Sequence, residues 1–224
     1  MKITWLGQAG LLFETKEITV MIDPYLSDSV KKINPKNYRR VAVCDSFFKL
    51  KPDIMIFTHN HLDHYDPETA EKFITKDSHL TVLAPGSVWN EARKLGGDNN
   101  YVVFNRHTVW TQGNLTFTAV KAEHSDPTPI GVIIDDGNKK YYVTGDTLYN
   151  EDIFSDIPDD IYALFLPVNG VGNNMNMTDA SKFAKRINPH IAIPIHCGMF
   201  DELDMDNFDY KNKYIPKIYK EIEV

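Results

Sequence analysis

Short apolar runs, separated by glycine, proline and polar residues, recur along the chain and predict a protein rich in β-strands. Three such runs follow one another closely at the start, which predicts a β-meander. A fourth run follows a long polar stretch, and the second part of the chain repeats the pattern. The expected strands are residues 3–6, 11–14, 18–22, 54–57, 115–120, 131–135, 139–144, 163–168 and 191–195.

Apolar residues at helical spacing occur between and after these runs. Asp66 followed by Pro67 is typical of a helix start, because aspartate caps free amide groups and proline suits the first turn. Ser87 is expected to cap a second helix, which Gly96 ends. Two further helices are expected, over residues 180–187 and 214–222.

The order of these elements predicts the fold class. Strand-rich halves that each carry helices indicate an α+β fold in which two sheets pack face to face with helices outside. No linker, repeat or low-complexity segment divides the sequence, so residues 1–224 are expected to form a single domain. The polar stretch 25–40 is expected to be a loop or a partly ordered flap.

Composition narrows the class of protein. A hydrophobic content of 42% over 224 residues supports a sizeable core, and the net charge of −7 disfavours a nucleic-acid partner. Two cysteines are too few for a disulfide framework and are consistent with a reducing compartment. The chain opens in a strand-like run and has no apolar stretch of about 20 residues. We therefore expect a cytoplasmic protein without membrane association.

The densest chemistry lies directly after the apolar run 54–57. His59, His61, Asp63 and His64 place three imidazoles and one carboxylate within six positions. A loop at a strand end can fold back on itself, so these side chains can reach one or two divalent ions. Neutral imidazole and carboxylate suit zinc, iron or manganese. The sequence therefore predicts a metal site here.

Three further candidate ligands follow other expected strands. His124 comes after the strand 115–120, and His196 comes after the strand 191–195. Asp146 follows Gly145, which lets the backbone turn tightly. Each of the three, taken alone, is more typical of a turn or a structural residue. Their shared position at strand ends predicts a common rim, where functional sites are usually built.

This order of residues resembles a known superfamily. His-x-His-x-Asp-His, then a histidine, then Gly-Asp, then a late histidine is similar to the metallo-β-lactamase-fold hydrolases over essentially the whole chain. Within that superfamily, four stretches resemble the ascorbate-6-phosphate lactonase-like branch: Trp5-Leu6-Gly7-Gln8-Ala9-Gly10, Asp23-Pro24, Gly145-Asp146-Thr147 and Ile193-Pro194-Ile195-His196. The resemblance implies a four-layer αββα sandwich and a metal-dependent hydrolase.

The resemblance also implies two divalent metal ions, with Zn²⁺ favoured and Mn²⁺ or Fe²⁺ as alternatives. One ion would be held by His59, His61 and His124, the other by Asp63, His64 and His196, with Asp146 bridging them. A hydroxide between the ions would attack a carbonyl or phosphoryl centre, and Asp63 would relay a proton to the leaving group.

Residues outside this ligand set are expected to support or extend the site. Asp23 is expected to orient a ligand from behind, with an ordinary turn aspartate as the equal alternative. Gln8 stands where many relatives carry histidine. Related hydrolases often have a histidine in the loop after residues 163–168, whereas this chain has asparagines there. The candidate substrate contacts are Asn169, Asn174 and Tyr149.

The leading interpretation is a lactonase-like hydrolase of a small lactone or ester. The flap carries basic residues that could attract an anionic substrate, with a solvated charge run as the usual alternative: Lys31, Lys32, Lys36, Arg39 and Arg40. The alternative function is a metal-dependent phosphodiesterase or nuclease of the same fold. A metal-binding module without catalysis is a third interpretation, which the complete ligand set disfavours.

Overall fold

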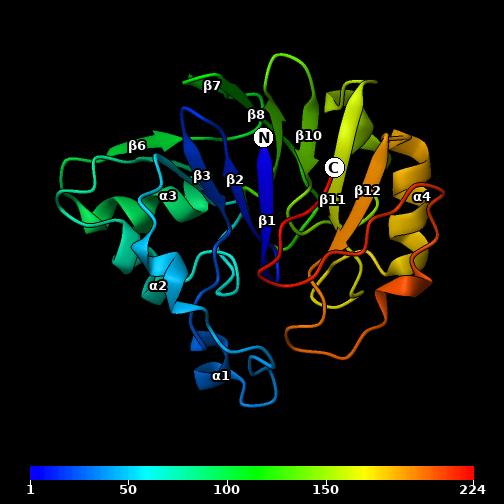
Figure 1. The fold of residues 1–224 in the computed structure, drawn as a ribbon, viewed down its shortest axis with the longest axis horizontal. Helices are drawn as coiled ribbons and strands as arrows, with labels where there is room; N and C mark the ends of the chain where they lie inside the picture. The colour runs from blue at the N-terminus through cyan, green and yellow to red at the C-terminus, as the bar shows by residue number, and fades with distance from the viewer.

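Two six-stranded sheets form the centre of the computed structural model, which describes residues 1–224, and helices cover both outer faces (Figure 1). Helices α2 (Pro67–Phe73) and α3 (Gly86–Ala92) lie on the outer face of the first sheet. Helix α4 (Met177–Ile187) lies on the outer face of the second sheet. The arrangement is the expected α+β sandwich of four layers.

The first sheet has the order β1-β2-β3-β4-β5-β6. Its first three strands are antiparallel, as the expected β-meander requires, and the remaining strands pair in parallel. The strands are β1 (Lys2–Gly7), β2 (Gly10–Glu14), β3 (Thr19–Ile22), β4 (Ile54–Ile56), β5 (Thr81–Ala84) and β6 (Asn100–Val103).

The second sheet has the order β12-β11-β10-β9-β8-β7, with an antiparallel portion from β7 to β10 and a parallel portion from β10 to β12. Both sheets therefore join a meander to a parallel part. The strands are β7 (Val109–Gln112), β8 (Leu115–Lys121), β9 (Ile130–Asp135), β10 (Lys140–Val143), β11 (Ile161–Pro167) and β12 (Ile191–Ile195).

Three apolar clusters fill the spaces between the four layers. The largest lies between the sheets and includes Phe13 and Phe165, whose rings meet edge to face at 5.9 Å. A second cluster packs α4 on the second sheet through Phe183, and a third packs α2 on the first sheet through Phe73. Burial of these side chains removes apolar surface from water and fixes both sheets as a rigid support for the loops.

Several expected elements differ in the structure. Helix α3 begins at Gly86 with Pro85 before it, so Ser87 lies inside the first turn and does not cap it. Strands β5, β6 and β7 lie outside the expected set. No residue of β6 or β7 is fully buried, so their apolar signal is weak, whereas β5 is a fully buried apolar strand that the prediction missed. The flap contains a single turn of helix, α1 (Ser29–Ile33).

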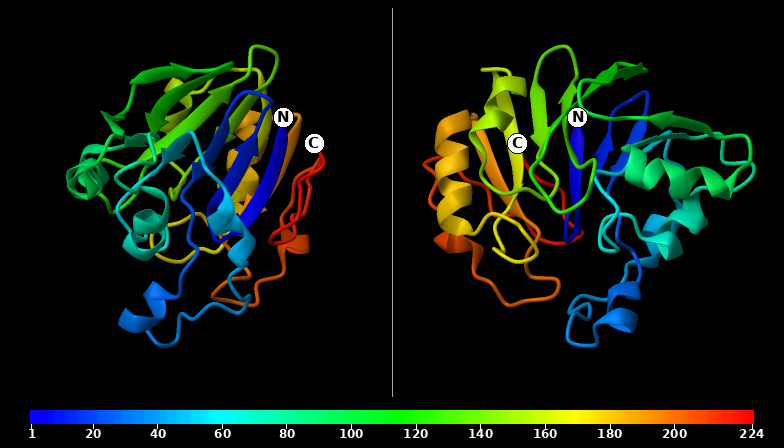
Figure 2. Two further views of the ribbon diagram at one scale, coloured as in Figure 1. Left: turned by 60° about the vertical axis from the view of Figure 1, so that its left-hand side comes forward. Right: turned by 180° about the vertical axis from the view of Figure 1, so that it is seen from behind.

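The expected helix over 214–222 is wrong. This segment is irregular, with a turn at residues 218–220, where Tyr219 has φ +63°. It lies along β1 instead, where the amide of Tyr219 donates to the carbonyl of Trp5 at 2.7 Å and the amide of Ile222 donates to the carbonyl of Ile3 at 2.8 Å. Figure 2 shows the C-terminal segment beside the first strand. The edge of the first sheet is thereby covered.

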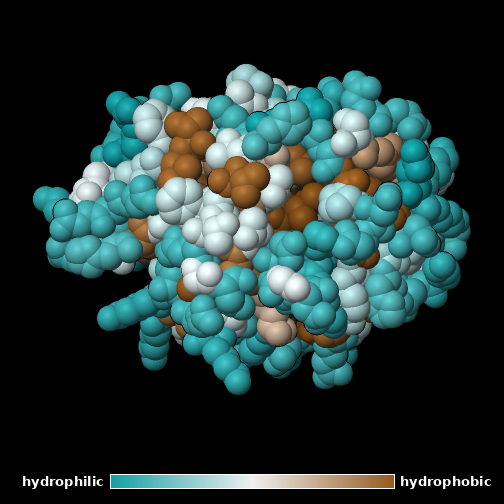
Figure 3. All heavy atoms as spheres, turned by 90° about the horizontal axis from the view of Figure 1, so that it is seen from above, coloured by the Kyte–Doolittle hydropathy of each residue, from teal (hydrophilic) through white to brown (hydrophobic).

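The two ends of the sandwich differ in what they carry. The loops after β4, β8, β10 and β12 gather at the end where α1 lies (Figure 1). The opposite end, seen in Figure 3, is mainly polar with scattered apolar side chains, and exposed valines occur on β6 and β7 at Val103 and Val109. The longest helix has 11 residues, and none has the length and hydrophobicity that crossing a membrane requires.

Candidate metal centre

The strand-end loops bring together all the side chains that the sequence singles out as metal ligands. The loop after β4 supplies four of them, and the loops after β8, β10 and β12 supply one each. Their potential ligand atoms form three overlapping groups, within each of which the atoms lie within 4.8 Å of one another. The groups are His59, His61 and His124; His59, His64 and Asp146; and Asp63, His64 and His196.

The turn that presents Asp146 depends on glycine. Gly145 has φ +62°, and a Cβ atom there would lie 2.8 Å from the carbonyl oxygen of Ile130 and 3.0 Å from Cβ of Thr58. Any larger residue would therefore push the loops after β4 and β10 apart. The glycine that precedes Asp146 in the sequence thus permits the close approach on which the site depends.

We call His59, His61 and His124 the first cluster, and Asp63, His64 and His196 the second cluster. In each cluster, nitrogen atoms of separate imidazoles face one another at short distance. Nδ1 of His61 is 3.0 Å from Nε2 of His124, and Nε2 of His64 is 3.1 Å from Nε2 of His196. Such convergence of lone pairs is what a shared cation requires.

The nitrogens on the outer side of these rings have protein partners. Nδ1 of His64 donates to Asp23 at 2.8 Å, and Nδ1 of His124 lies 3.2 Å from the carbonyl oxygen of Asn173. Nδ1 of His196 lies 3.0 Å from the side-chain amide of Asn169. Metal-binding histidines typically donate the outer N–H to an oxygen, so that the inner nitrogen faces the ion, and His64 and His124 have such oxygen partners. The partner of His196 is an amide nitrogen, which donates and does not accept.

Asp146 stands between the two clusters. Its Oδ1 lies 3.2 Å from Nε2 of His64 and 3.2 Å from Nε2 of His196. Its Oδ2 lies 3.9 Å from Nε2 of His124 and accepts a hydrogen bond of 2.7 Å from the amide of Asn174. One carboxylate oxygen is therefore directed to each cluster.

Two buried atoms of the site lack hydrogen-bond partners, namely Nε2 of His59 and Oδ1 of Asp146. Buried polar atoms are rarely left unpaired, because the loss of water costs about 1–3 kcal/mol per group. A divalent cation bound beside either atom would satisfy it and would accept the donor set of imidazoles and carboxylates. The residues present therefore fit a metal centre.

The two clusters differ in their proton affinity. Burial lowers the pKa of His59 well below its ordinary value, and burial also lowers the pKa of His124. Burial acts in the same direction on His196, but the negative charges of Asp146 and Asp63 close to its ring outweigh this effect and raise its pKa to about 9. The neutral imidazole is therefore favoured at His59 and His124, whereas the carboxylates of the second cluster and Asp146 stabilise positive charge at His196.

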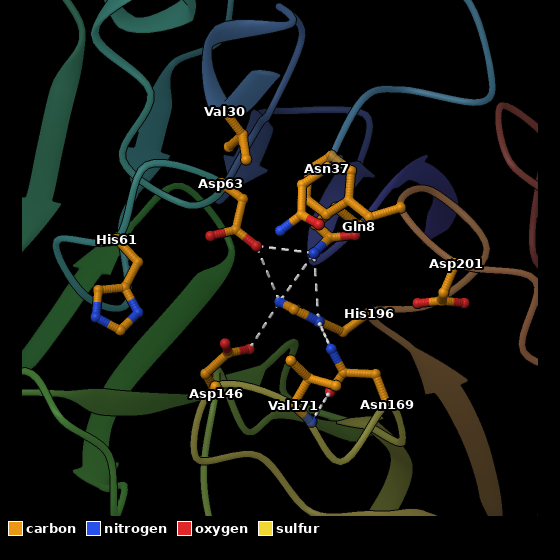
Figure 4. Close-up of a pocket in the computed structure, with 12 residues that line it drawn as sticks. Gln8, Val30, Asn37, His61, Asp63, Asp146, Asn169, Val171, His196 and Asp201 are labelled. Carbon is orange, nitrogen blue, oxygen red and sulfur yellow. Dashed lines mark hydrogen bonds and ion pairs between the residues drawn. The ribbon is translucent and has the colours of Figure 1, made fainter. Parts of the chain in front are cut away.

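A cavity of about 240 Å³ opens onto the site (Figure 4). Asp63 and His196 lie at its floor, and Nε2 of Gln8 donates to Oδ2 of Asp63 at 2.8 Å. Asn169 lines this cavity. Asn174 is buried behind Asp146, and Tyr149 lies outside the cavity with its hydroxyl bonded to Glu151.

Asp23 supports the second cluster from the side away from the cavity. It accepts a hydrogen bond from His64 and makes further contacts. It also accepts hydrogen bonds from the amide of Thr58 at 2.8 Å and from the hydroxyl of Thr58 at 2.5 Å. That hydroxyl in turn lies 3.1 Å from Nδ1 of His59. Thr58 therefore links the supports of the two clusters, a role that no sequence signal indicated.

Sequence reasoning missed two polar residues that line the cavity, Asn37 and Asp201. Asn37 comes from the flap and Asp201 from the loop after β12. Neither belongs to a spacing pattern, because both reach the cavity through irregular loops. None of the five basic residues of the flap lines the cavity.

Comparison with known proteins identifies the family. Residues 2–196 match the family described as "Beta-lactamase superfamily domain". A UPF0173 metal-dependent hydrolase from Thermoplasma acidophilum is 32% identical over 244 aligned positions, which cover 100% of this chain and 99% of that protein. The chain belongs to the UPF0173 metal-dependent hydrolases of the beta-lactamase superfamily. A second UPF0173 hydrolase, from Methanopyrus kandleri, is 28% identical across 100% of this chain and 95% of its own length.

Solved structures show the same fold for this UPF0173 hydrolase. Igni18, a metallo hydrolase from Ignicoccus hospitalis, superposes with a TM-score of 0.78 at 19% identity and covers 99% of this chain and 97% of its own. A possible metal-dependent hydrolase from Veillonella parvula gives 0.79 at 17% identity, covering 100% and 99%. At this level of identity the likeness concerns the fold alone.

Proposed function

We propose that this metal-dependent hydrolase uses a binuclear centre to hydrolyse a small lactone or ester, as the likeness to the ascorbate-6-phosphate lactonase-like branch suggests. The observation that carries the proposal is the position of Asp146, which directs one oxygen to each cluster. A carboxylate between two groups of histidines is the arrangement that suits two ions and one bridging ligand.

The first cluster and the second cluster would each hold one ion, with Asp146 between them. When bound, the ions supply Lewis acidity and a hydroxide nucleophile near neutral pH. Asp63 lines the cavity and has 19% of its side chain exposed, so it can meet a substrate directly. We assign it the transfer of a proton, taken up from the attacking water, to the leaving alkoxide, in addition to its place in the second cluster.

Gln8 fixes the position of Asp63 in the second cluster. The amide of Gln8 holds Oδ2 of Asp63, which fixes the carboxylate toward the cavity floor. Gln8 is itself held, because its backbone carbonyl accepts hydrogen bonds from the ring nitrogen of Trp5 at 2.9 Å and the amide of His196 at 3.0 Å. Groups held in this way need little reorganisation during a reaction.

The cavity favours a small substrate over a nucleic acid. No lysine or arginine lines it, whereas enzymes that hold a polyanionic backbone neutralise the phosphates with such side chains. Its volume suits a compound of the size of a monosaccharide lactone. These features support lactone or ester hydrolysis over phosphodiester cleavage.

The test is hydrolysis by protein stripped with a chelator and reloaded with Zn²⁺ or Mn²⁺, assayed on sugar lactones, acyl lactones and a simple phosphodiester. We expect lactone turnover that falls by about 10²–10⁴-fold in Asp63→Ala. Circular dichroism establishes that the variant is folded. Turnover of the phosphodiester alone would refute lactone hydrolysis and favour a nuclease or phosphodiesterase.

A further inference from the structure

The wall of the cavity that faces away from His61 carries unpaired polar groups. Figure 4 shows Asp201 on this side, beyond His196. Oδ1 of Asp201 accepts hydrogen bonds from the amides of Gly198 at 2.9 Å and Leu203 at 3.0 Å, whereas its Oδ2 has no hydrogen-bond partner in the protein. The carboxylate is thus fixed by one oxygen and free at the other.

Asn37 provides a second free group at the same cavity. Its side-chain amide makes no hydrogen bond, although its backbone is held by the carbonyl of Asn34 at 2.9 Å. An amide can donate and accept, and a carboxylate oxygen accepts only. A ligand that pairs with both groups must offer hydrogen-bond donors, and a hydroxyl group meets this need.

The two arginines of the flap are engaged outside the cavity. Arg39 donates to the carbonyl of Tyr25 at 2.5 Å and to the hydroxyl of Tyr219 at 2.6 Å. Arg40 donates to the carbonyl of Phe200, and its charge lies 3.7 Å from the carboxylate of Glu202. These arginines fasten the flap to the C-terminal loops, and no lysine or arginine lines the cavity.

The negative charge of Asp201 on this wall therefore affects which substrates the cavity can bind. A phosphate or carboxylate placed away from the reacting carbonyl would meet Asp201 without a lysine or arginine to offset it. We propose that the cavity selects an uncharged, hydroxyl-bearing lactone or ester, and that Asp201 discriminates against its phosphorylated or carboxylated counterpart. This inference rests on the proposed hydrolysis and adds the substrate class.

The kinetic test compares a matched pair, glucono-δ-lactone and its 6-phosphate, at low ionic strength with metal-loaded protein. We expect wild type to prefer the neutral lactone in kcat/KM, and Asp201→Asn to reduce that preference about tenfold by accelerating the phosphorylated one. Asparagine keeps an oxygen that can accept from Gly198 and Leu203, so the loop is expected to hold its shape. Added salt should reduce the preference of wild type.

Asp204→Asn is the matched control. Asp204 also caps a turn, since its Oδ1 accepts from the amide of Asp206 at 3.0 Å, but it does not line the cavity. Its substitution should leave the ratio of the two substrates unchanged. A preference of wild type for the phosphorylated lactone, or an equal ratio in Asp201→Asn and wild type, would overturn the proposal.

A binding measurement separates this inference from the proposed reaction. Calorimetry with 1,5-anhydroglucitol and its 6-phosphate, which lack the scissile carbonyl, requires no turnover. Tighter binding of the neutral compound, with a gain for the phosphate only in Asp201→Asn, supports selection by Asp201 even if neither lactone is hydrolysed. In that case the lactonase proposal alone fails. Binding of neither compound to wild type would overturn the inference.

Discussion

The two clusters of the metal centre are built from similar ligands but differ in charge and support. The first cluster consists of three histidines whose pKa values, where shifted, are lowered by burial. The second contains a carboxylate, and Asp23 and Asp146 also contact its His64, at 2.8 and 3.2 Å. Positive charge is therefore stabilised more strongly in the second cluster.

The difference follows from where the chain places its acidic residues. The loop after β4 contributes to both clusters, but Asp23, from the end of β3, reaches only the second. In the first cluster the outer nitrogens meet a hydroxyl and a backbone carbonyl, at His59 and His124. A carboxylate is a stronger partner for an imidazole than either group. We infer that the second cluster is the tighter site for a divalent ion.

The largest effect is expected when the link between the clusters is removed. Asp146→Ala takes one oxygen from each cluster, so it should reduce kcat/KM by at least about 10³-fold and reduce the metal content of both sites. Mass spectrometric metal analysis and kinetics measure the two effects. Asp159→Ala is the control, because Asp159 is exposed and makes no ion pair. Unchanged metal content in Asp146→Ala would contradict the bridging position that we propose for this carboxylate.

A smaller effect, limited to one cluster, is expected from the support behind it. Asp23→Asn replaces a carboxylate that accepts from Nδ1 of His64, and an amide nitrogen placed there would oppose that proton. Affinity of the second cluster for Zn²⁺ should fall about 10–100-fold, while that of the first stays near its original value.

Competition with a chromophoric chelator resolves the two affinities. Asp53→Asn is the matched control, since Oδ2 of Asp53 also accepts a backbone bond, from the amide of Thr19 at 2.8 Å, at the other end of the same sheet. An equal decline at both clusters in Asp23→Asn would show that Asp23 supports the loop as a whole and not the second cluster.

The ligands at strand ends could be predicted from the sequence, whereas the cavity residues on irregular loops could not. The ligands come directly after strands, and strand ends are fixed by the apolar pattern, so the spacing of His59 to His64 and the position of Asp146 carried the signal. The structure brings these predicted ligands together. Asn37 and Asp201 reach the cavity through irregular loops, whose paths depend on tertiary contacts such as those of Arg39 and Arg40.

The fold also has parts that could be predicted from the sequence and one part that could not. The sandwich and its strongest strands followed from apolar runs, and Asp66 caps α2 through the amides of Glu68 and Thr69 as expected. The helix predicted over residues 214–222 was wrong because the apolar side chains of this segment pack against two different apolar clusters. Ile218 and Ile222 face the central core, whereas Tyr219 packs against the cluster under α2. The spacing of apolar residues cannot distinguish such a non-helical segment from a helix when the strand that it pairs with, here β1, is distant in the sequence.

The smallest effect is expected from a charge cluster away from the metal centre. Asp156 accepts two hydrogen bonds from Arg106, at 2.7 and 2.8 Å, and one from the amide of Lys121 at 2.9 Å. Asp156→Asn should lower the free energy of unfolding near neutral pH by about 1–2 kcal/mol, because one charge-assisted pair is lost. Metal content and kcat/KM should not change, which distinguishes this cluster from both metal clusters.

The pH dependence gives the sign of this effect. The hydrogen bonds from Arg106 hold the pKa of Asp156 well below its usual range, so the folded state binds this proton more weakly than the unfolded state. Its contribution is therefore complete above about pH 5 and is lost as the pH falls through and below about 4. Urea unfolding of wild type and Asp156→Asn at several pH values should show a stability difference that shrinks on acidification.

Asp160→Asn, which removes only an exposed pair with Lys140, should change stability little at any pH. A difference for Asp156→Asn that stays constant down to pH values well below about 4 would mean that its carboxylate charge contributes nothing to the fold.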